Sequence, residues 1–149
     1  MTAQLTSLTE LYEQDETAWL DAMAELVAER RFDEFDLEHL QEFLTDMANR
    51  DRKEVRSRLT VLLTHLLKYR YQSERRSRSW QSTIVVQRQE LVRDASSGVL
   101  HSHAKDVLPD AYVMAVERAS TQTGLPSATF PKKCPWSLHQ LFTDDLLKE

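Results

Sequence analysis

The acidic segment 36–46 is the first candidate for chemistry, because it places a carboxylate and an imidazole where they could bind one metal ion. Asp36 and His39 stand three residues apart, a spacing that puts both side chains on one face of a helix. A di-iron bundle also needs Glu residues or Glu-x-x-His pairs on its other helices, and the sequence has none. We therefore expect a solvated or salt-bridged acidic face and predict no metal site and no cofactor.

The other histidines and the single cysteine form no recognisable catalytic pattern. His101 and His103 could converge only in an extended segment, and His139 is far along the chain. Cys134 follows two lysines, a setting that could lower the pKa of its thiol, but nothing in the sequence places a base beside it. The chain has only 2 glycines, which excludes the glycine-rich loops that hold nucleotide phosphates. No catalytic residue is predicted.

Three polar or amphipathic side chains are predicted to be buried. Asp15 falls on an apolar helical stripe beside Trp19, where a carboxylate is costly unless it is paired. His65 lies within a run of leucines, and Trp80 belongs to the next predicted helix. We interpret Asp15 and His65 as hydrogen-bonded side chains and predict that they pair between neighbouring antiparallel helices.

Positive charge gathers between residues 68 and 78, in a chain whose formal net charge is -5. The basic residues of this stretch are Lys68, Arg70, Arg75, Arg76 and Arg78. One interpretation is a surface that binds nucleic-acid phosphates, with neighbouring aromatic rings stacking on bases. The other is an internal set of ion pairs, since arginine favours bidentate contacts with carboxylates. The negative overall charge favours the internal interpretation, because nucleic-acid-binding domains are usually basic.

Charge is distributed unevenly along the chain. Residues 1–48 contain 13 acids and 2 bases, a net charge of -11, whereas residues 49–93 contain 4 acids and 12 bases, a net charge of +8. The remaining residues have a net charge of -2. An acidic first third beside a basic middle is what an antiparallel pair of helices would use to pair its faces. We expect the arginines of the middle to face the acids of the first third.

The composition indicates one soluble, helical domain over residues 1–149. Hydrophobic residues make up 41% and charged residues 29% of the chain, and only 2 glycines and 4 prolines interrupt it. Such a scarcity of turn residues favours long helices over a sheet. A single cysteine cannot form an internal disulfide, and neither an export signal nor a membrane span is visible. A cytoplasmic location is expected, with no membrane partner.

Apolar residues at three- and four-residue spacing predict a first helix over residues 8–30 and a second over 36–70. Asp36 is the expected N-cap of the second helix. About 50 Å of uninterrupted helix would result, which leaves open whether the helix kinks near 50–54, protrudes or forms the spine of the molecule. An antiparallel pair of these two helices is the predicted core.

The second half of the chain predicts further helices. Ser77 or Ser79 caps the third; residues 84–86 have strand propensity, but a helix is favoured because no turn or partner strand is evident. A fourth helix begins near Val99, with a kink or fresh turn at Pro109, and Gly124 ends it. Ser137 caps a last short helix through Leu141.

Nine separated motifs resemble, in order, a bacterial family catalogued as domain of unknown function 29. The matching positions are Tyr12, Asp15 and Trp19, then 36–38, 57–72, RSRSW at 76–80, 83–84, 87–88, TGLP at 123–126, and 130–131 with 134–135. The resemblance covers nearly the whole chain. It implies an all-helical bacterial protein and brings no catalytic residues to transfer.

We therefore predict an all-α, single-domain bundle of four to six helices with a long second helix. The leading functional hypothesis is a small cytoplasmic interaction or regulatory protein that binds a protein partner or itself. The alternative is a nucleic-acid-binding module that uses the basic stretch 68–78. An enzyme is the third hypothesis, and it would require a solvent-accessible pocket that gathers Asp15, His65 and an arginine.

Overall fold

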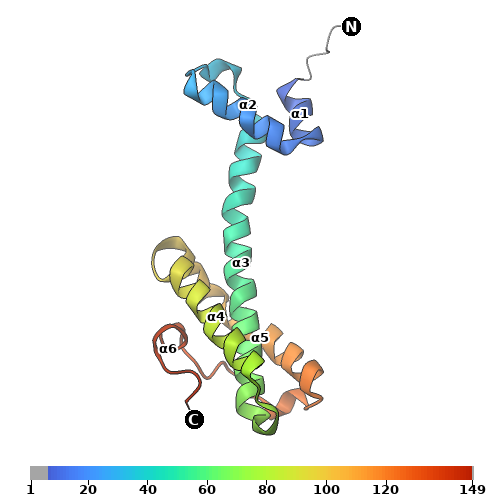
Figure 1. Cartoon of the computed structure of the whole chain (residues 1–149), viewed down its shortest axis with the longest axis vertical. Helices are drawn as coiled ribbons and strands as arrows, with labels where there is room; N and C mark the ends of the chain where they lie inside the picture. The colour runs from blue at the N-terminus through green and yellow to red at the C-terminus, as the bar shows by residue number, and fades with distance from the viewer. Residues whose placement is uncertain (1–6, 149) are drawn as a thin grey trace. The chain divides into compact units, whose positions relative to one another are not determined.

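The computed structural model describes residues 7–148, and within them every regular element is helical. The six α-helices confirm the predicted all-α class (Figure 1). They are α1 (Leu8–Gln14), α2 (Glu16–Ala28), α3 (Leu37–Tyr71), α4 (Arg78–Ala95), α5 (Gly98–Thr123) and α6 (Leu138–Thr143). Three short 3-10 turns, η1 (Phe32–Glu34), η2 (Ser73–Arg75) and η3 (Ser127–Thr129), lie between them.

The chain divides into two compact units, an N-terminal unit of residues 1–49 and a C-terminal unit of residues 50–149. The boundary falls inside α3, next to residues 50–54, where the sequence replaces apolar side chains by charged ones. These residues are helical. The assignment of one domain to residues 1–149 stays a prediction.

The predicted first helix is wrong at Asp15, where the structure has two helices instead of one. The backbone of Asp15 leaves the helical region, with φ at -155°, and its carboxylate accepts a hydrogen bond of 3.1 Å from the amide of Ala18. Asp15 is therefore the N-cap of α2. An aspartate can satisfy a free amide at a helix start, and this local bond outweighs continuation of the apolar stripe.

A small aromatic cluster holds the N-terminal unit together. Trp19 of α2 is completely buried, and Met23 is nearly so. The Trp19 ring lies 4.8 Å from Tyr12 of α1 and 5.9 Å from Phe43 of α3, measured between ring centroids. Aromatic rings bury large apolar areas. One tryptophan thus joins the three helices of this unit.

The long second helix is confirmed as α3, from Leu37 to Tyr71. Asp36 precedes it as predicted, with its Oδ1 accepting from the amide of His39. The apolar stripe does not stay on one interface, however. Leu37 and Leu44 are 66% and 59% exposed, whereas Leu59 and its neighbours further along α3 are buried in the C-terminal unit.

The main apolar core lies in the C-terminal unit, so the prediction of a core made by the first two helices is wrong. Side chains of α3 between Val55 and Tyr69 pack with Ile84 and Leu91 of α4, Ala111 of α5 and residues of α6. In this half of α3 leucines occupy two adjacent faces, so the helix must be covered on two sides. The main core therefore forms around the half of α3 between Val55 and Tyr69.

The caps predicted for the later helices are largely confirmed. Ser77 is the N-cap of α4 through a bond to the Trp80 amide, and residues 84–86 are helical. Pro109 lies inside α5, which continues past it to Gly124, whose φ of 77° ends the helix. Ser137 and Gln140 form a capping box at the start of α6. No helix among the described residues is long and apolar enough to cross a bilayer.

Candidate functional site

The basic stretch runs from the end of α3, through η2, to the first residue of α4. Its cations do not share one environment. Arg70, Arg75 and Arg78 are exposed, Arg76 is half-buried and Lys68 is buried. Three of the five predicted binding residues are therefore at the surface of the C-terminal unit, where a partner could reach them.

Lys68 must be removed from the predicted binding surface. Its side chain points into the unit, where Nζ donates a hydrogen bond of 2.9 Å to Gln122 Oε1. The ammonium also lies 4.7 Å from the ring centroid of Trp80. Burial lowers the pKa of Lys68, because a buried ammonium loses its hydration. Its long apolar stem explains why a lysine can occupy this position.

Arg70 and Arg76 lie against aromatic rings. Arg76 donates a hydrogen bond of 2.7 Å from Nε to the carbonyl of Tyr69, and its guanidinium lies 4.1 Å from the centroid of that ring. The guanidinium of Arg70 lies 5.5 Å from the ring of Trp136. These contacts lie within the C-terminal unit, and the predicted pairing with acids of the first third stays a prediction.

A pocket of about 640 Å³ opens beside these arginines. Arg70, Arg76 and Lys148 line it, together with the carboxylates Asp144 and Asp145. Asp145 is already used inside its own turn, since its Oδ1 accepts from the amide of Leu147 at 3.2 Å. The pocket therefore offers charges of both signs, and its electrostatics do not select a simple anion.

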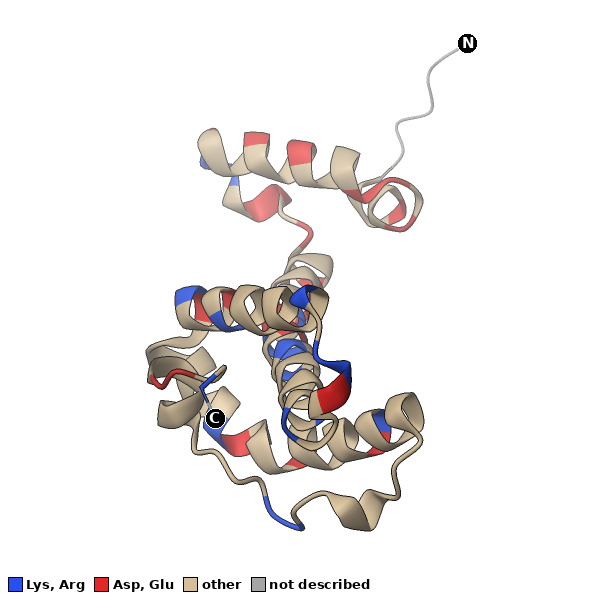
Figure 2. Ribbon diagram, turned by 60° about the horizontal axis from the view of Figure 1, so that its bottom comes forward, with Lys and Arg blue, Asp and Glu red and all other residues tan. Residues whose placement is uncertain are grey.

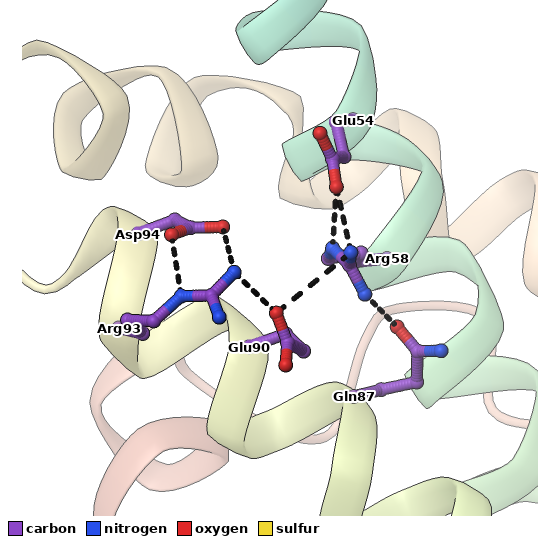
Figure 3. Close-up of polar contacts among 6 residues, drawn as sticks. All are labelled: Glu54, Arg58, Gln87, Glu90, Arg93 and Asp94. Carbon is purple, nitrogen blue, oxygen red and sulfur yellow. Dashed lines mark hydrogen bonds and ion pairs between the residues drawn. The ribbon is translucent and has the colours of Figure 1, made fainter.

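The ion pairs of the basic middle segment are centred on different arginines (Figure 3). Arg58 of α3 contacts Glu54 at 2.6 Å and also reaches Gln87 and Glu90 of α4. Arg93 pairs with Glu90 and Asp94. Two of the acids in this network, Glu54 and Glu90, come from the same segment 49–93 as the arginines, and Asp94 directly follows it. The internal salt-bridge system thus ties α3 to α4 within the C-terminal unit.

The three residues predicted to be buried have different positions. Asp15 is exposed, so the prediction of a buried carboxylate is wrong. The Asp15 side chain is the N-cap of α2. His65 and Trp80 are half-buried. The His65 ring places Nδ1 at 2.9 Å from the carbonyl of Val61, and burial lowers the pKa of His65. Asp15 and His65 each make a hydrogen bond to a nearby backbone group, which gives no support to the predicted Asp15–His65 pair.

Cys134 departs from the sequence interpretation. Its thiol donates to the carbonyl of Trp136, with 3.2 Å between Sγ and oxygen. Burial raises the pKa of the Cys134 thiol, whereas the neighbouring lysines had indicated a lower value. A raised pKa makes the thiolate scarcer and the thiol less reactive. Within the described residues, no group of three or more His, Cys, Asp or Glu side chains could hold a metal ion.

Comparison with known families matches residues 11–147 to the family described as Domain of unknown function DUF29. The chain belongs to this family. The curated proteins and the solved structures contain no match to it. The resemblance inferred from the nine motifs is therefore confirmed for nearly the whole length of the DUF29 chain.

The DUF29 chain also contains a polar cluster that the sequence did not predict. Asp36 Oδ2 lies 2.8 Å from His39 Nδ1 and accepts a hydrogen bond of 3.2 Å from Trp19 Nε1. The Tyr12 ring stacks on His39 at 4.3 Å, and Glu13 Oε1 is 3.6 Å from His39 Nε2. Tyr12, Trp19 and Asp36 are among the motif positions of the family resemblance. The Asp-x-x-His spacing was considered as a metal-binding pair and a solvated or salt-bridged face was predicted instead, but the partners Trp19 and Tyr12 were not anticipated.

Proposed function

We propose that the chain is a cytoplasmic interaction protein whose N-terminal unit binds a basic, amphipathic segment of a protein partner. The observation that carries the proposal is the coincidence of strong negative charge and exposed apolar side chains on one compact unit. Cytoplasmic location is part of the proposal, and the single cysteine, which cannot form an internal disulfide, supports it. A regulatory rather than catalytic role is part of the same proposal.

Charge supports a basic partner. Residues 1–49 contain 13 acids and 2 bases, a net charge of -11, and residues 50–149 contain 11 acids and 17 bases, a net charge of +6. Figure 2 shows acidic positions distributed along the N-terminal helices. Such a field attracts cations and speeds their association. Two N-terminal units facing each other would repel, which disfavours self-association through this surface.

Exposed apolar residues support an amphipathic partner. Val27, Phe32, Leu37 and Leu44 are each more than half exposed. Leu37 and Leu44 are seven residues apart on α3, so they share one face of the helix. Large exposed apolar groups on a charged unit are typical of interaction sites. This face would take the apolar side of a partner helix.

A shallow groove in the same unit supports the same partner. It has a volume of about 270 Å³ and is lined by Leu8, Leu26, Glu25, Glu29 and Glu34, with Ala22 and Arg31. Arg31 pairs with Glu29 at 2.8 Å and with Glu34, and the bond to Arg31 lowers the pKa of Glu34. The groove thus combines apolar side chains with three glutamates, two of which pair with Arg31. A lysine side chain fits this combination, because its stem is apolar and its head is charged.

The proposal is tested by fluorescence anisotropy with a labelled helical peptide that carries leucines on one face and lysines on the other. The full chain should bind it, and the double variant L37S/L44S should bind about tenfold more weakly, since two apolar anchors are lost. The V113S variant is the matched control, because Val113 is equally exposed on α5 of the other unit.

Charge is tested separately with a second peptide in which every lysine is replaced by glutamate. We expect no binding of this peptide, and weaker binding of the lysine peptide as salt is raised from about 50 to 200 mM. Equal binding of both peptides would contradict the proposal. Equal binding of the lysine peptide by the V113S and L37S/L44S variants would also contradict the proposal.

A second candidate function is nucleic-acid binding by the C-terminal unit. The exposure of Arg70, Arg75 and Arg78 supports it, since phosphates require accessible cations. Labelled single- and double-stranded oligonucleotides, titrated at about 50 and 200 mM salt, should then bind with a steep salt dependence. Binding should disappear in R70A/R75A/R78A and persist when the exposed bases Arg118, Lys132 and Lys133 are changed to Ala. Flat anisotropy for the unmodified chain would exclude this candidate.

A further inference from the structure

We propose that a pocket between α4, α5 and α6 binds a small amphipathic carboxylate, a ligand with one anionic head and a short hydrocarbon body. The pocket has a volume of about 410 Å³, within the usual range for small-molecule sites. All three helices belong to the C-terminal unit, and α4 and α5 each contact α6 (Figure 1). The site is distinct from the surfaces considered under the proposed function.

The body of the pocket is apolar. Val92 of α4 and Leu138 and Phe142 of α6 line it. Leu138 is almost completely buried in the core, whereas Val92 is more than a third exposed, so the apolar lining extends from the core to solvent. A hydrocarbon group placed here would leave water on binding, which is favourable in proportion to the apolar area covered.

Every ionisable side chain that lines the pocket is a base. These residues are His101 and Lys105 of α5 and His139 of α6. Within the part of the chain that the structure describes, neither Lys105 nor the ring of His139 has a hydrogen-bond or ion-pair partner. A lysine ammonium offers three N–H donors and no acceptor. The pocket is therefore lined by basic residues and by no carboxylate.

His101 is held in a defined orientation. Its Nδ1 lies 3.0 Å from the carbonyl of Ala95, and its ring meets Phe142 edge-on with 6.1 Å between centroids. The carbonyl requires a proton on Nδ1, so Nε2 accepts a hydrogen bond in the neutral ring and donates one only in the protonated ring. Ser96 and Thr143 complete the polar lining, and the Thr143 hydroxyl already donates a hydrogen bond of 2.8 Å to the carbonyl of His139. The polar groups are thus few, on a largely apolar surface, and Lys105 is the donor among them with no protein partner.

The absence of acids from its lining distinguishes this pocket from two others in the C-terminal unit. Asp144 and Asp145 line the pocket beside Arg70, and Asp51, Glu54 and Asp94 line the pocket at the α3–α4 ion-pair network. In those two sites a bound anion would meet like charges. The α4–α5–α6 pocket lacks that repulsion, and a carboxylate is the anion that combines readily with an apolar body.

The test is isothermal titration of the full chain with hexanoate, hexanol and hexylamine, which share one chain length and differ in the charge of the head group. Hexanoate is expected to bind with an affinity of about millimolar, as its size allows. Hexanol should bind about tenfold more weakly, since it lacks the charge-assisted hydrogen bond. Inorganic phosphate and acetate should not bind, because neither covers the apolar lining.

Two variants locate the site. K105Q removes the charge and should weaken hexanoate binding about tenfold while leaving hexanol unchanged. K132Q is the matched control, since Lys132 is an exposed lysine outside the pocket, and it should bind as the unmodified chain does. V92T, which keeps the shape of the side chain and adds a hydroxyl, should weaken both ligands.

Three results would overturn the proposal. The first is no detectable binding of hexanoate at a concentration about ten times the expected millimolar dissociation constant. The second is equal affinity for hexanoate and hexylamine. The third is an equal loss of affinity for hexanoate in K105Q and K132Q. Because these variants change exposed positions rather than the core, circular dichroism should confirm that each is folded. The ¹H–¹⁵N spectra of Lys105 and His139 provide an independent readout, since only binding in this pocket would shift both.

Discussion

The ring of His39 lies against the carboxylate of Asp36, with 2.8 Å between His39 Nδ1 and Asp36 Oδ2. Both side chains are almost completely withdrawn from solvent. Asp36 also precedes the first turn of α3 and accepts from Trp19 of α2. A single carboxylate therefore joins a helix start, an imidazole and the buried tryptophan of the N-terminal unit.

The stability of the N-terminal unit should depend on pH through this pair. The hydrogen bond to Asp36 raises the pKa of His39 above its ordinary 6.5, so the stabilisation from His39 is complete below pH 6.5 and is lost as pH rises through the raised pKa. Burial alone would raise the pKa of Asp36, but hydrogen bonds from His39 and Trp19 outweigh it and lower the pKa below 3.8. The stabilisation from Asp36 is lost as pH falls through that lowered pKa.

The pair should therefore contribute most between about pH 4 and 6.5. Urea unfolding followed by the Trp19 indole resonance measures this dependence. H39Q should remove the decline above pH 6.5 and keep the decline at acid pH. An unchanged decline in H39Q would show that another group is responsible.

Two aspartates that cap helices should differ in importance. D36A leaves the Trp19 and His39 donors without an acceptor and removes the cap of α3, so we expect a loss of about 2–3 kcal/mol in unfolding free energy. D15A removes only an exposed cap and should cost about 1 kcal/mol. D36N, which retains an acceptor and a capping group, should lie between them. Equal losses in D36A and D15A would contradict the special role of Asp36.

The ion pairs of Figure 3 should contribute unequally to the free energy of unfolding. The side chain of Arg58 is 24% exposed and that of Arg93 is 64% exposed. Solvent therefore screens the ion pairs of Arg93 more strongly than those of Arg58. We expect R58M to lower the unfolding free energy by about 0.5–1 kcal/mol and R93M by less than about 0.5 kcal/mol. Chemical denaturation at low and high salt checks this, and the difference should shrink as salt rises.

Lys68 should be replaceable by an apolar residue of similar length. K68M removes a buried ammonium whose desolvation opposes folding, and its partner Gln122 is exposed and can bind water instead. We expect the unfolding free energy to stay unchanged or rise by about 1 kcal/mol. K132M, at an exposed position, is the control and should change little. A loss above about 2 kcal/mol in K68M alone would mean that the contacts with Gln122 and Trp80 outweigh the desolvation.

Local capping signals account for the helix boundaries that the sequence predicted well. Asp36, Ser77 and Ser137 each begin a helix, and Gly124 ends one. These outcomes depend on one side chain or one backbone angle and the few residues beside it. Asp15 obeys the same rule, and it was misjudged because the apolar stripe around it favoured one continuous helix.

The candidate sites were less predictable, because residue types do not show which side chains distant in sequence lie in contact. Charge alone grouped Lys68 with Arg70, Arg75 and Arg78, but the turn of α3 that carries Lys68 faces Gln122 of α5. The bases His101, Lys105 and His139 are separated by up to 38 positions, and they line one pocket because α5 and α6 contact each other. No spacing in the sequence could indicate that pocket.

The sequence by itself determined the all-α class, the long α3 helix and the separation of acidic from basic segments, because these follow from local periodicity, caps and composition. The family was indicated separately, by the resemblance of nine ordered motifs. Only the tertiary structure decided that the main core lies in the C-terminal unit and that Asp36 joins His39 to Trp19. It also decided which cations reach solvent. The physical reason is that burial depends on contacts between residues distant in sequence, and a carboxylate or an ammonium behaves according to the neighbours that those contacts supply.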